Sequence, residues 1–328
     1  MLLKEAVQNF LTGYFATHRR SEKTRIAYRT DLKQLELYIG SEWPIHSVTA
    51  ESLESWARMM RSSQYATVSI RRKFATVRLF FSYLTRKSVL ESSPISGIRL
   101  DLRSQRMLPR ALTARDTKLL IEEVWRTLNQ CPKRIPSPRD PRFLATRNIA
   151  IIEILFATGM RVGELVGLSV RDWHEEESLF VVMGKGGRQR LALIPDNRSR
   201  SAIRTYLAER SIISPSTDAL FVNPSGRRLS PQGVSRVIRI VARQAGLEIH
   251  VTPHMLRHTV ATLLLRCGAD IRIVQEVLGH ASIVTTQRYT YVSKEHLLTA
   301  LHAHHPNNHL RIDSPPRELD NQLMLPLA

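Results

Sequence analysis

The sequence predicts a mainly α-helical protein with two domains and one small β-hairpin. Apolar residues recur at the helical spacing through most of the chain, whereas only two short runs have the composition of β-strands. The chain has 328 residues, of which 43% are hydrophobic, so it is long enough to form two separate cores. Residues 92–109 contain breakers and basic residues without periodicity, as expected of a linker between these cores.

Four amphipathic helices are predicted in the N-terminal third of the chain. Each has an apolar stripe at helical spacing, and Thr49 is a typical helix-capping residue at the start of the third. The predicted helices cover residues 2–15, 21–39, 49–60 and 67–84. We expect them to form a small bundle, a domain of residues 1–102, followed by a linker of residues 103–110.

The second predicted domain spans residues 111–306 and combines helices with the hairpin. Two β-prone runs, residues 179–183 and 190–194, flank a glycine-rich turn that places Lys185 at its tip. Periodicity and capping signals predict further helices at residues 113–128, 147–157, 231–245 and 293–304. Gly159 suits a left-handed stop for the second of these, which leaves Arg161 at the turn into a following helix. Residues 307–328 are rich in proline, asparagine and charge, and we expect them to form a flexible tail.

The chain carries a large excess of positive charge. Its 48 lysines and arginines exceed its 29 acidic residues, which gives a formal net charge of +19. About half of the excess lies in the first 110 residues, which contain 19 basic and 9 acidic side chains. Such a surface is expected to bind an extended anion such as DNA, largely through its phosphates. Three neighbouring cations of the fourth helix are expected to face DNA: Arg71, Arg72 and Lys73.

Cysteine usage and hydropathy predict the compartment. Cys131 and Cys267 lie far apart and form no C-x-x-C pattern, so neither a disulfide framework nor a structural zinc site is expected. The sequence has no apolar run of about 18 residues and no secretory signal pattern at Met1. We therefore expect a cytoplasmic, nucleoid-associated protein that does not insert into membranes.

A cluster of polar residues is predicted at the start of one C-terminal helix. Thr252 and Pro253 are a helix-start signal, and they place His254 and Arg257 in the first turn. Backbone amides and a guanidinium at such a position favour a bound anion such as phosphate. A zinc pair of His254 and His258 is disfavoured, because Arg257 would oppose the cation.

A second polar group follows the helix that ends at Leu278 and Gly279. The glycine suits a helix C-cap, which places His280 just past the helix. Tyr289 follows nine residues later, on a short predicted helix. Donors that can hold an anion are thus followed by a candidate nucleophile.

Four ordered blocks of the sequence resemble the signature of the tyrosine recombinases, also called phage-integrase-type recombinases. The blocks are residues 157–165 around Arg161, the hairpin with Lys185, His254-x-x-Arg257-His258, and residues 278–289 ending at Tyr289. The resemblance covers residues 1–306 and is greatest to the Xer branch. It implies a C-shaped DNA clamp, with a helical SAM-like core-binding domain at the N-terminus and a catalytic domain at the C-terminus.

The resemblance also implies the chemistry of these residues. Tyr289 would attack a DNA phosphodiester and form a 3′-phosphotyrosyl link, without a metal or cofactor. Arginines and histidines would neutralise the phosphate, and a lysine would protonate the departing 5′ oxygen. The implied catalytic residues are Arg161, Lys185, His254, Arg257, His280 and Tyr289. Glu164 and His258 would support them.

The implied partners are a double-stranded recombination site and a tetramer. The tetramer would form with itself or with a related recombinase and would exchange strands through a Holliday junction. The predicted helix of residues 231–245 also presents basic residues at near-helical spacing, and we expect them to contact DNA: Arg236, Arg239 and Arg243.

Three alternatives to recombination remain at this point. A type IB topoisomerase would use the same chemistry as a monomer on one duplex. A non-catalytic architectural or repressor protein would keep the basic clamp, but it would not need all six polar residues at their positions. A protein-interaction module without DNA binding would leave the charge excess unexplained.

Overall fold

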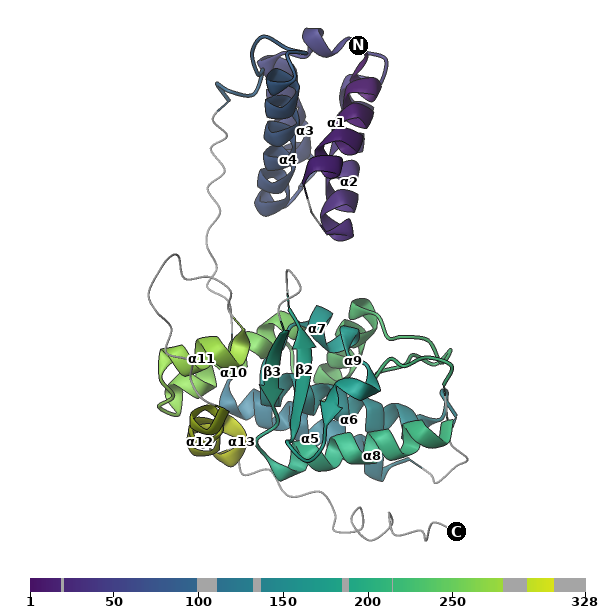
Figure 1. Cartoon of the computed structure of the whole chain (residues 1–328), viewed down its shortest axis with the longest axis vertical. Coiled ribbons are helices and arrows are strands. Elements are labelled where there is room, and N and C mark those ends of the chain that lie inside the picture. Colours follow the sequence, from purple (N-terminus) through teal and green to yellow (C-terminus); the bar gives the residue numbers. More distant parts are fainter. Residues whose placement is uncertain are drawn as a thin grey trace. The chain divides into compact units, whose positions relative to one another are not determined.

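The computed structural model describes residues 1–18, 21–98, 111–131, 137–184, 189–213, 215–279 and 294–309. The chain divides into two compact units, Met1–Met107 and Leu108–Ala328 (Figure 1). Each unit has its own hydrophobic core, and helices predominate in both. The predicted mainly α fold class is confirmed.

The N-terminal unit contains the four predicted helices, α1 (Leu3–Thr17), α2 (Glu22–Ile39), α3 (Ala50–Ser62) and α4 (Thr67–Arg86). Thr49 caps α3 as expected, because its hydroxyl accepts a hydrogen bond from the Ser52 amide at 3.2 Å. Aromatic rings fill much of the core, and Phe10 of α1 meets Phe80 of α4 edge to face at 5.6 Å between ring centroids. These contacts join α1 to α4.

A buried carboxylate also joins α2 to α4 and corrects one expectation. Asp31 is fully buried and accepts hydrogen bonds from Arg72, Lys73 and Thr76. Lys73 is 3% exposed and also donates to Gln34. Its ammonium group is therefore buried inside the unit, contrary to the expectation that it faces DNA. An ammonium next to a buried carboxylate is held by charge pairing, which a count of basic residues does not detect.

The central helix of the C-terminal unit is α6 (Pro141–Thr158). Fourteen of its eighteen residues are buried, and it packs against α5 (Ala114–Asn129), α8 (Asn197–Ile213) and α10 (Pro253–Arg266). The predicted start at residue 147 was wrong, because Asp140 caps the helix through the Arg142 and Phe143 amides and Pro141 takes the first position.

A small antiparallel sheet accompanies these helices, with strand order β1 (Trp173–His174), β2 (Leu179–Met183) and β3 (Gln189–Leu193). The pairing of Val181 with Leu191 confirms the predicted hairpin. Its tip, residues 185–188, lies outside the described residues. Among the elements of this unit that were not predicted are β1, which has only two residues, and α8, whose buried face includes polar Ser199 and Arg210.

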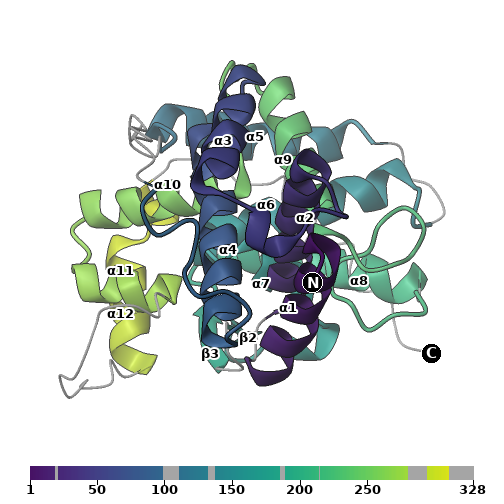
Figure 2. The same cartoon turned by 90° about the horizontal axis from the view of Figure 1, so that it is seen from above.

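The remaining elements are α7 (Val162–Gly167), α9 (Pro231–Gln244), α11 (Ile271–Leu278), α12 (Lys294–His304) and α13 (Pro306–His309), together with the 3-10 helices η1 (Ile45–Ser47) and η2 (Val170–Asp172). Helix α12 lies beside α11 in both views (Figures 1 and 2). The predicted helices of residues 231–245 and 293–304 are present, and α13 occupies the first residues of the predicted tail. In the parts of the chain described here, no helix is long and apolar enough to span a membrane.

Candidate active site

The glycine that ends α6 directs the chain toward the candidate site. Gly159 has a φ of +56° and caps the helix in the left-handed conformation, as predicted, with its amide bonded to the Leu155 carbonyl. A Cβ atom at this position would lie 2.5 Å from a side-chain carbon of Leu278, so close packing also requires glycine. Two residues later the chain enters α7, with Arg161 as its N-terminal cap residue.

Glu164 holds Arg161 through both the backbone and the side chain. Its Oε2 accepts from the Arg161 amide at 2.9 Å, and its Oε1 accepts from Arg161 Nη1 at 2.7 Å. Burial raises the pKa of Glu164, but hydrogen bonds from the Arg161 amide and from Arg190 outweigh burial and bring its pKa below the ordinary value. The carboxylate is therefore ionised at neutral pH.

Arg257 is the fifth residue of α10, just past the first turn in which the sequence analysis placed it. Thr252 caps this helix by accepting from the Met255 amide at 3.1 Å, and Pro253 is its first residue. The Arg257 residue is only 7% exposed. Burial first, and then the nearby charge of Arg161, lower the pKa of Arg257 to about 10, which still leaves the guanidinium protonated at neutral pH.

The turn after α11 brings the two arginines together. Arg257 Nη2 donates to the Leu278 carbonyl at 2.7 Å, and Arg161 Nη2 donates to the next carbonyl, that of Gly279, at 3.2 Å. Arg257 Nη1 donates in addition to the carbonyl of Gly159 at 2.8 Å. The consecutive carbonyls of Leu278 and Gly279, which directly precede His280 in the chain, thus hold two guanidiniums from distant parts of the sequence.

Arg190 is a member of this cluster that the sequence analysis missed. It lies on β3, and its Nη2 donates to Glu164 Oε2 at 2.8 Å while its Nη1 donates to the Val277 carbonyl at 3.1 Å. The guanidiniums of Arg161 and Arg190 therefore bind one carboxylate, whose charge also acts on Arg257. The only sequence signal was an arginine at the start of a predicted strand, where a solvent-exposed role is the ordinary expectation.

The histidines and the nucleophile complete the predicted set. His254 is exposed on α10, three residues before Arg257, and His258 is half-buried on the next turn. Lys185, His280 and Tyr289 lie outside the described residues. The described part of the site is thus a cationic cluster that suits an anion of one or two negative charges.

Comparison with known proteins identifies the origin of this arrangement. The model of the phage integrase family matches residues 119–296, and that of its N-terminal SAM-like domain matches residues 7–88. The chain belongs to the phage integrase family. It is a site-specific tyrosine recombinase.

Two relatives illustrate how much of the chain the family accounts for. The recombinase is 37% identical to tyrosine recombinase XerD of Halalkalibacterium halodurans over 307 residues, and the aligned region covers 92% of this chain and 97% of that protein. It is 34% identical over 311 residues to tyrosine recombinase XerC of Alcanivorax borkumensis, covering 94% and 96%.

Solved structures show the same fold at lower identity. A lambda integrase dimer bound to a COC′ core site is 16% identical, with a TM-score of 0.66 over 89% of this chain and all of that one. XerH site-specific recombinase bound to a palindromic difH substrate is 21% identical, with a TM-score of 0.64 over 97% of this chain and 83% of that one.

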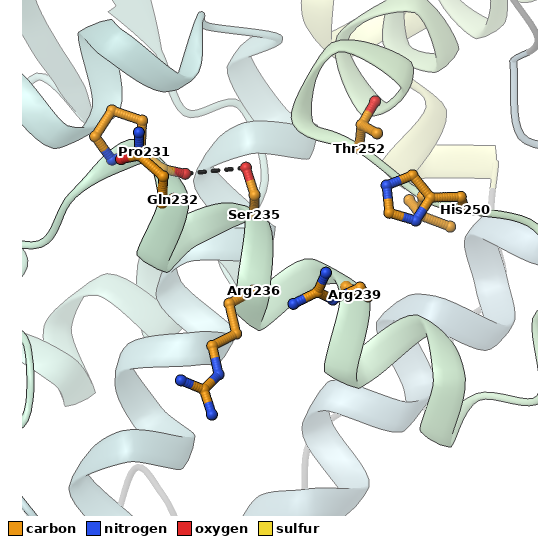
Figure 3. A pocket seen from close by; sticks show the side chains of 8 residues that line it. Pro231, Gln232, Ser235, Arg236, Arg239, His250 and Thr252 are labelled. Carbon is orange, nitrogen blue, oxygen red and sulfur yellow. Dashed lines mark hydrogen bonds between the residues drawn. The ribbon is translucent and has the colours of Figure 1, made fainter. Parts of the chain in front are cut away.

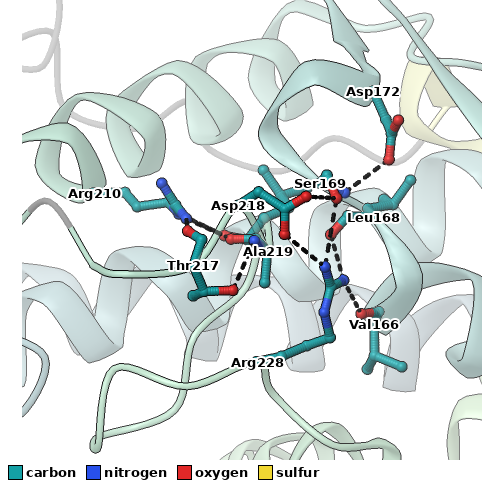
Figure 4. A network of polar contacts seen from close by, with 10 residues as sticks. Val166, Leu168, Ser169, Asp172, Arg210, Thr217, Asp218, Ala219 and Arg228 are labelled. Carbon is teal, nitrogen blue, oxygen red and sulfur yellow. Dashed lines mark hydrogen bonds and ion pairs between the residues drawn. The ribbon is translucent and has the colours of Figure 1, made fainter.

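A polar network supports the recombinase's α7 from its C-terminal end (Figure 4). Arg228 Nη1 donates to the carbonyls of Val166 and Leu168, both at 2.9 Å, and its Nη2 contacts Asp218 at 3.1 Å. These carbonyls end α7, where helical partners run out, and the guanidinium donates to both, alongside the Leu220 amide that also bonds the Leu168 carbonyl at 2.9 Å. The helix that starts with Arg161 is therefore held at both ends.

A hollow lies between α9 and the segment before α10 (Figure 3). Its volume is about 370 Å³, and its lining includes the predicted DNA contacts Arg236 and Arg239, with His250 opposite them. Arg243 is exposed on the same helix but does not line the hollow. Two of the three arginines thus share one concave surface that leads to Thr252, the cap of the helix carrying Arg257.

Proposed function

We propose that this recombinase cuts and rejoins DNA by attaching a 3′ phosphate to Tyr289. The observation that carries the proposal is the pair of guanidiniums, Arg161 and Arg257, held by consecutive carbonyls at Leu278 and Gly279. Two cations beside each other, partly desolvated and already oriented, are what a phosphodiester requires as negative charge builds up at phosphorus during attack.

The proton transfers are assigned to the remaining predicted residues. The Tyr289 phenol must lose a proton to become an effective nucleophile, and His254 or His280 accepts it or hydrogen-bonds the phosphate. The departing 5′ oxygen must gain a proton, because an alkoxide is a poor leaving group, and we assign this role to Lys185. Rejoining reverses these steps with a 5′ hydroxyl from another duplex.

We also propose the assembly in which the reaction occurs. The partner is a double-stranded recombination site, bound by the basic N-terminal unit and by α9. The lambda integrase neighbour forms a tetramer on a Holliday junction. We extend that assembly to this chain, with itself or a related recombinase as partner, acting in the cytoplasm on nucleoid DNA. Similarity to the Xer relatives favours resolution of joined DNA molecules as the task, and similarity to the integrases favours insertion or excision of mobile DNA.

The test is covalent adduct formation on a nicked duplex. The site is obtained by selecting bound duplexes from a random library with the purified full-length chain, and adducts are separated on a denaturing gel. Tyr289→Phe removes only the nucleophilic oxygen, so DNA binding should persist while the adduct disappears. Tyr291→Phe is the matched control and should keep the adduct, because positions two apart on the helix that the sequence predicts there point about 200° apart.

Two outcomes would contradict the proposal. An adduct in the Tyr289→Phe lane, or its loss only with Tyr291→Phe, would assign the nucleophile elsewhere. Relaxation of supercoiled plasmid without any joining between two labelled duplexes would indicate a topoisomerase and not a recombinase.

A further inference from the structure

We propose that Arg190 is a positioning residue that keeps Arg161 available for the scissile phosphate. This inference deepens the proposed function and rests on it. Arg161 and Arg257 belong to the motif blocks of the family resemblance, whereas Arg190 had no assigned role.

The contacts of Arg190 divide the Glu164 carboxylate between two arginines. Oε1 binds Arg161 Nη1 at 2.7 Å, whereas Oε2 binds Arg190 Nη2 at 2.8 Å in addition to the Arg161 backbone amide at 2.9 Å. With Arg190 present, the carboxylate does not form a two-pronged pair with the Arg161 guanidinium, which is the strongest pairing that these groups can make. Arg161 therefore keeps donor capacity that a phosphate can use.

Exposure separates the two arginines by role. The Arg190 side chain is 14% exposed, and both of its terminal nitrogens donate to protein oxygens, those of Glu164 and Val277. The Arg161 side chain is 46% exposed. A phosphate entering from solvent would meet Arg161, while Arg190 acts on that contact through Glu164.

Close packing keeps Arg190 in this position. Gly279 has a φ of +63°, and a Cβ atom there would lie 2.6 Å from Arg190 Cδ, so the arginine stem occupies the space next to the glycine. Arg190 thereby links β3 to the end of α11, whose last carbonyls also hold Arg161 and Arg257. Its Nε is buried without a hydrogen-bond partner among the described residues.

The experiment compares variants of the full-length chain on two nicked substrates. One carries the selected site with an ordinary scissile phosphate, and the other carries a methylphosphonate there, which lacks one negative charge. The variants are Arg190→Gln, Arg190→Lys, Glu164→Gln and the double variant Glu164→Gln/Arg190→Gln. Arg204→Gln is the control, because Arg204 forms an exposed pair with Glu175 on the protein surface.

We expect Arg190→Gln to slow adduct formation on the ordinary phosphate by about 10- to 100-fold, because a misplaced reacting group loses rate on that scale. DNA affinity should stay near that of the control, and rates are compared at a temperature where circular dichroism shows each variant to be folded. On the methylphosphonate most of the loss should disappear, because less charge needs neutralising. The rate of Arg190→Lys should lie between those of the wild type and Arg190→Gln, since one ammonium cannot bond both Glu164 and the Val277 carbonyl as the planar guanidinium does. If Arg190→Gln does not fold, Arg190→Lys takes its place in the comparison.

The double variant tests whether Arg190 acts through Glu164. If it does, adding Arg190→Gln to Glu164→Gln should cost less than about threefold beyond the Glu164→Gln variant, because the losses of two coupled residues do not multiply. Rate losses that multiply, equal losses on both substrates, or an Arg190→Gln rate equal to that of the control would each overturn the inference. In the last case wild-type adduct formation would leave the proposed function standing, whereas absence of any wild-type adduct would overturn both.

Discussion

Arg257 is a buried cation whose hydrogen bonds to the described residues go to backbone carbonyls. Its two terminal nitrogens bond Gly159 and Leu278, so the guanidinium is oriented before any substrate arrives. Desolvation and the charge of Arg161 disfavour its charged form, as its pKa of about 10 shows. A phosphate would relieve both effects, because it supplies the negative charge that the site lacks.

We predict that Arg257→Lys abolishes most adduct formation while DNA binding remains. Lysine has one nitrogen in place of the planar fork, so it cannot bond both carbonyls and also reach a phosphate. The expected loss is about 100- to 1,000-fold, the range for removing one oriented donor from an active site. The measurement is the adduct rate on the nicked site, with the exposed Arg266→Lys of the same helix as control. A loss below about threefold would contradict the role of Arg257, by comparison with that range.

Lys185 is predicted to be the general acid, and a sulfur-substituted substrate tests this role. A substrate with sulfur in place of the bridging 5′ oxygen releases a thiolate, which leaves without a proton. Lys185→Ala should therefore slow cleavage of ordinary DNA by about 100-fold or more and affect the sulfur substrate far less. Equal losses on the two substrates, measured under single-turnover conditions, would remove Lys185 from this role.

At the scale of elements, the C-terminal helices are anchored by one buried imidazole. His305 lies between α12 and α13; its Nε2 donates to the Ala157 carbonyl at 2.9 Å, and its Nδ1 accepts from the Asn307 amide at 3.2 Å. Both ring nitrogens are satisfied only in the neutral form. Burial lowers the pKa of His305 to about 4, although the charge of Asp196 acts in the opposite direction.

This anchoring predicts a pH dependence of stability. The folded pKa of about 4 lies below the ordinary value of 6.5, so His305 contributes stability above pH 6.5 that is lost as the pH falls toward 4. Between about pH 7 and pH 5 the loss is of the order of 2 kcal/mol. His305→Gln keeps an N–H donor but does not titrate. In denaturant unfolding, the free energy of unfolding of this variant should therefore fall by about 2 kcal/mol less than that of the wild type between about pH 7 and pH 5.

The control for this prediction is His174→Gln, which changes an exposed histidine of β1 and should keep the wild-type slope. If His305→Gln and wild type lose the same stability between these pH values, His305 is not the titrating anchor.

At the scale of the whole molecule, the chain forms two separate hydrophobic cores and carries a net charge of +19. The N-terminal unit, Met1–Met107, encloses its own apolar cluster, and its surface includes the exposed Arg71. We therefore predict that this unit folds alone and binds duplex DNA without sequence preference. Its affinity should fall by about 10³-fold or more between about 50 and 200 mM salt, as phosphate contacts require.

Fluorescence anisotropy of a labelled duplex, measured across that salt range, tests this prediction, with circular dichroism to verify that the unit is folded. Binding that does not depend on salt, or no binding at low salt, would contradict a phosphate clamp.

The sequence by itself determined the local features of this recombinase. The cap at Thr252, the left-handed stops at Gly159 and Gly279, and the hairpin strands were all predicted, because each depends on residues that are neighbours in the chain. The ordered motif blocks also determined the family. Errors arose where a local signal was overlooked, as at Asp140, or where the periodicity was weak, as in α8.

Only the tertiary structure decided which charges meet. Arg190 and Lys73 looked like surface cations, yet one shares the Glu164 carboxylate with Arg161 and the other pairs with buried Asp31. Such pairings join helices and strands that are distant in sequence, and their geometry depends on how whole elements pack. A desolvated ion pair is stable only when its partner is held at bonding distance, and that distance is a property of the folded chain.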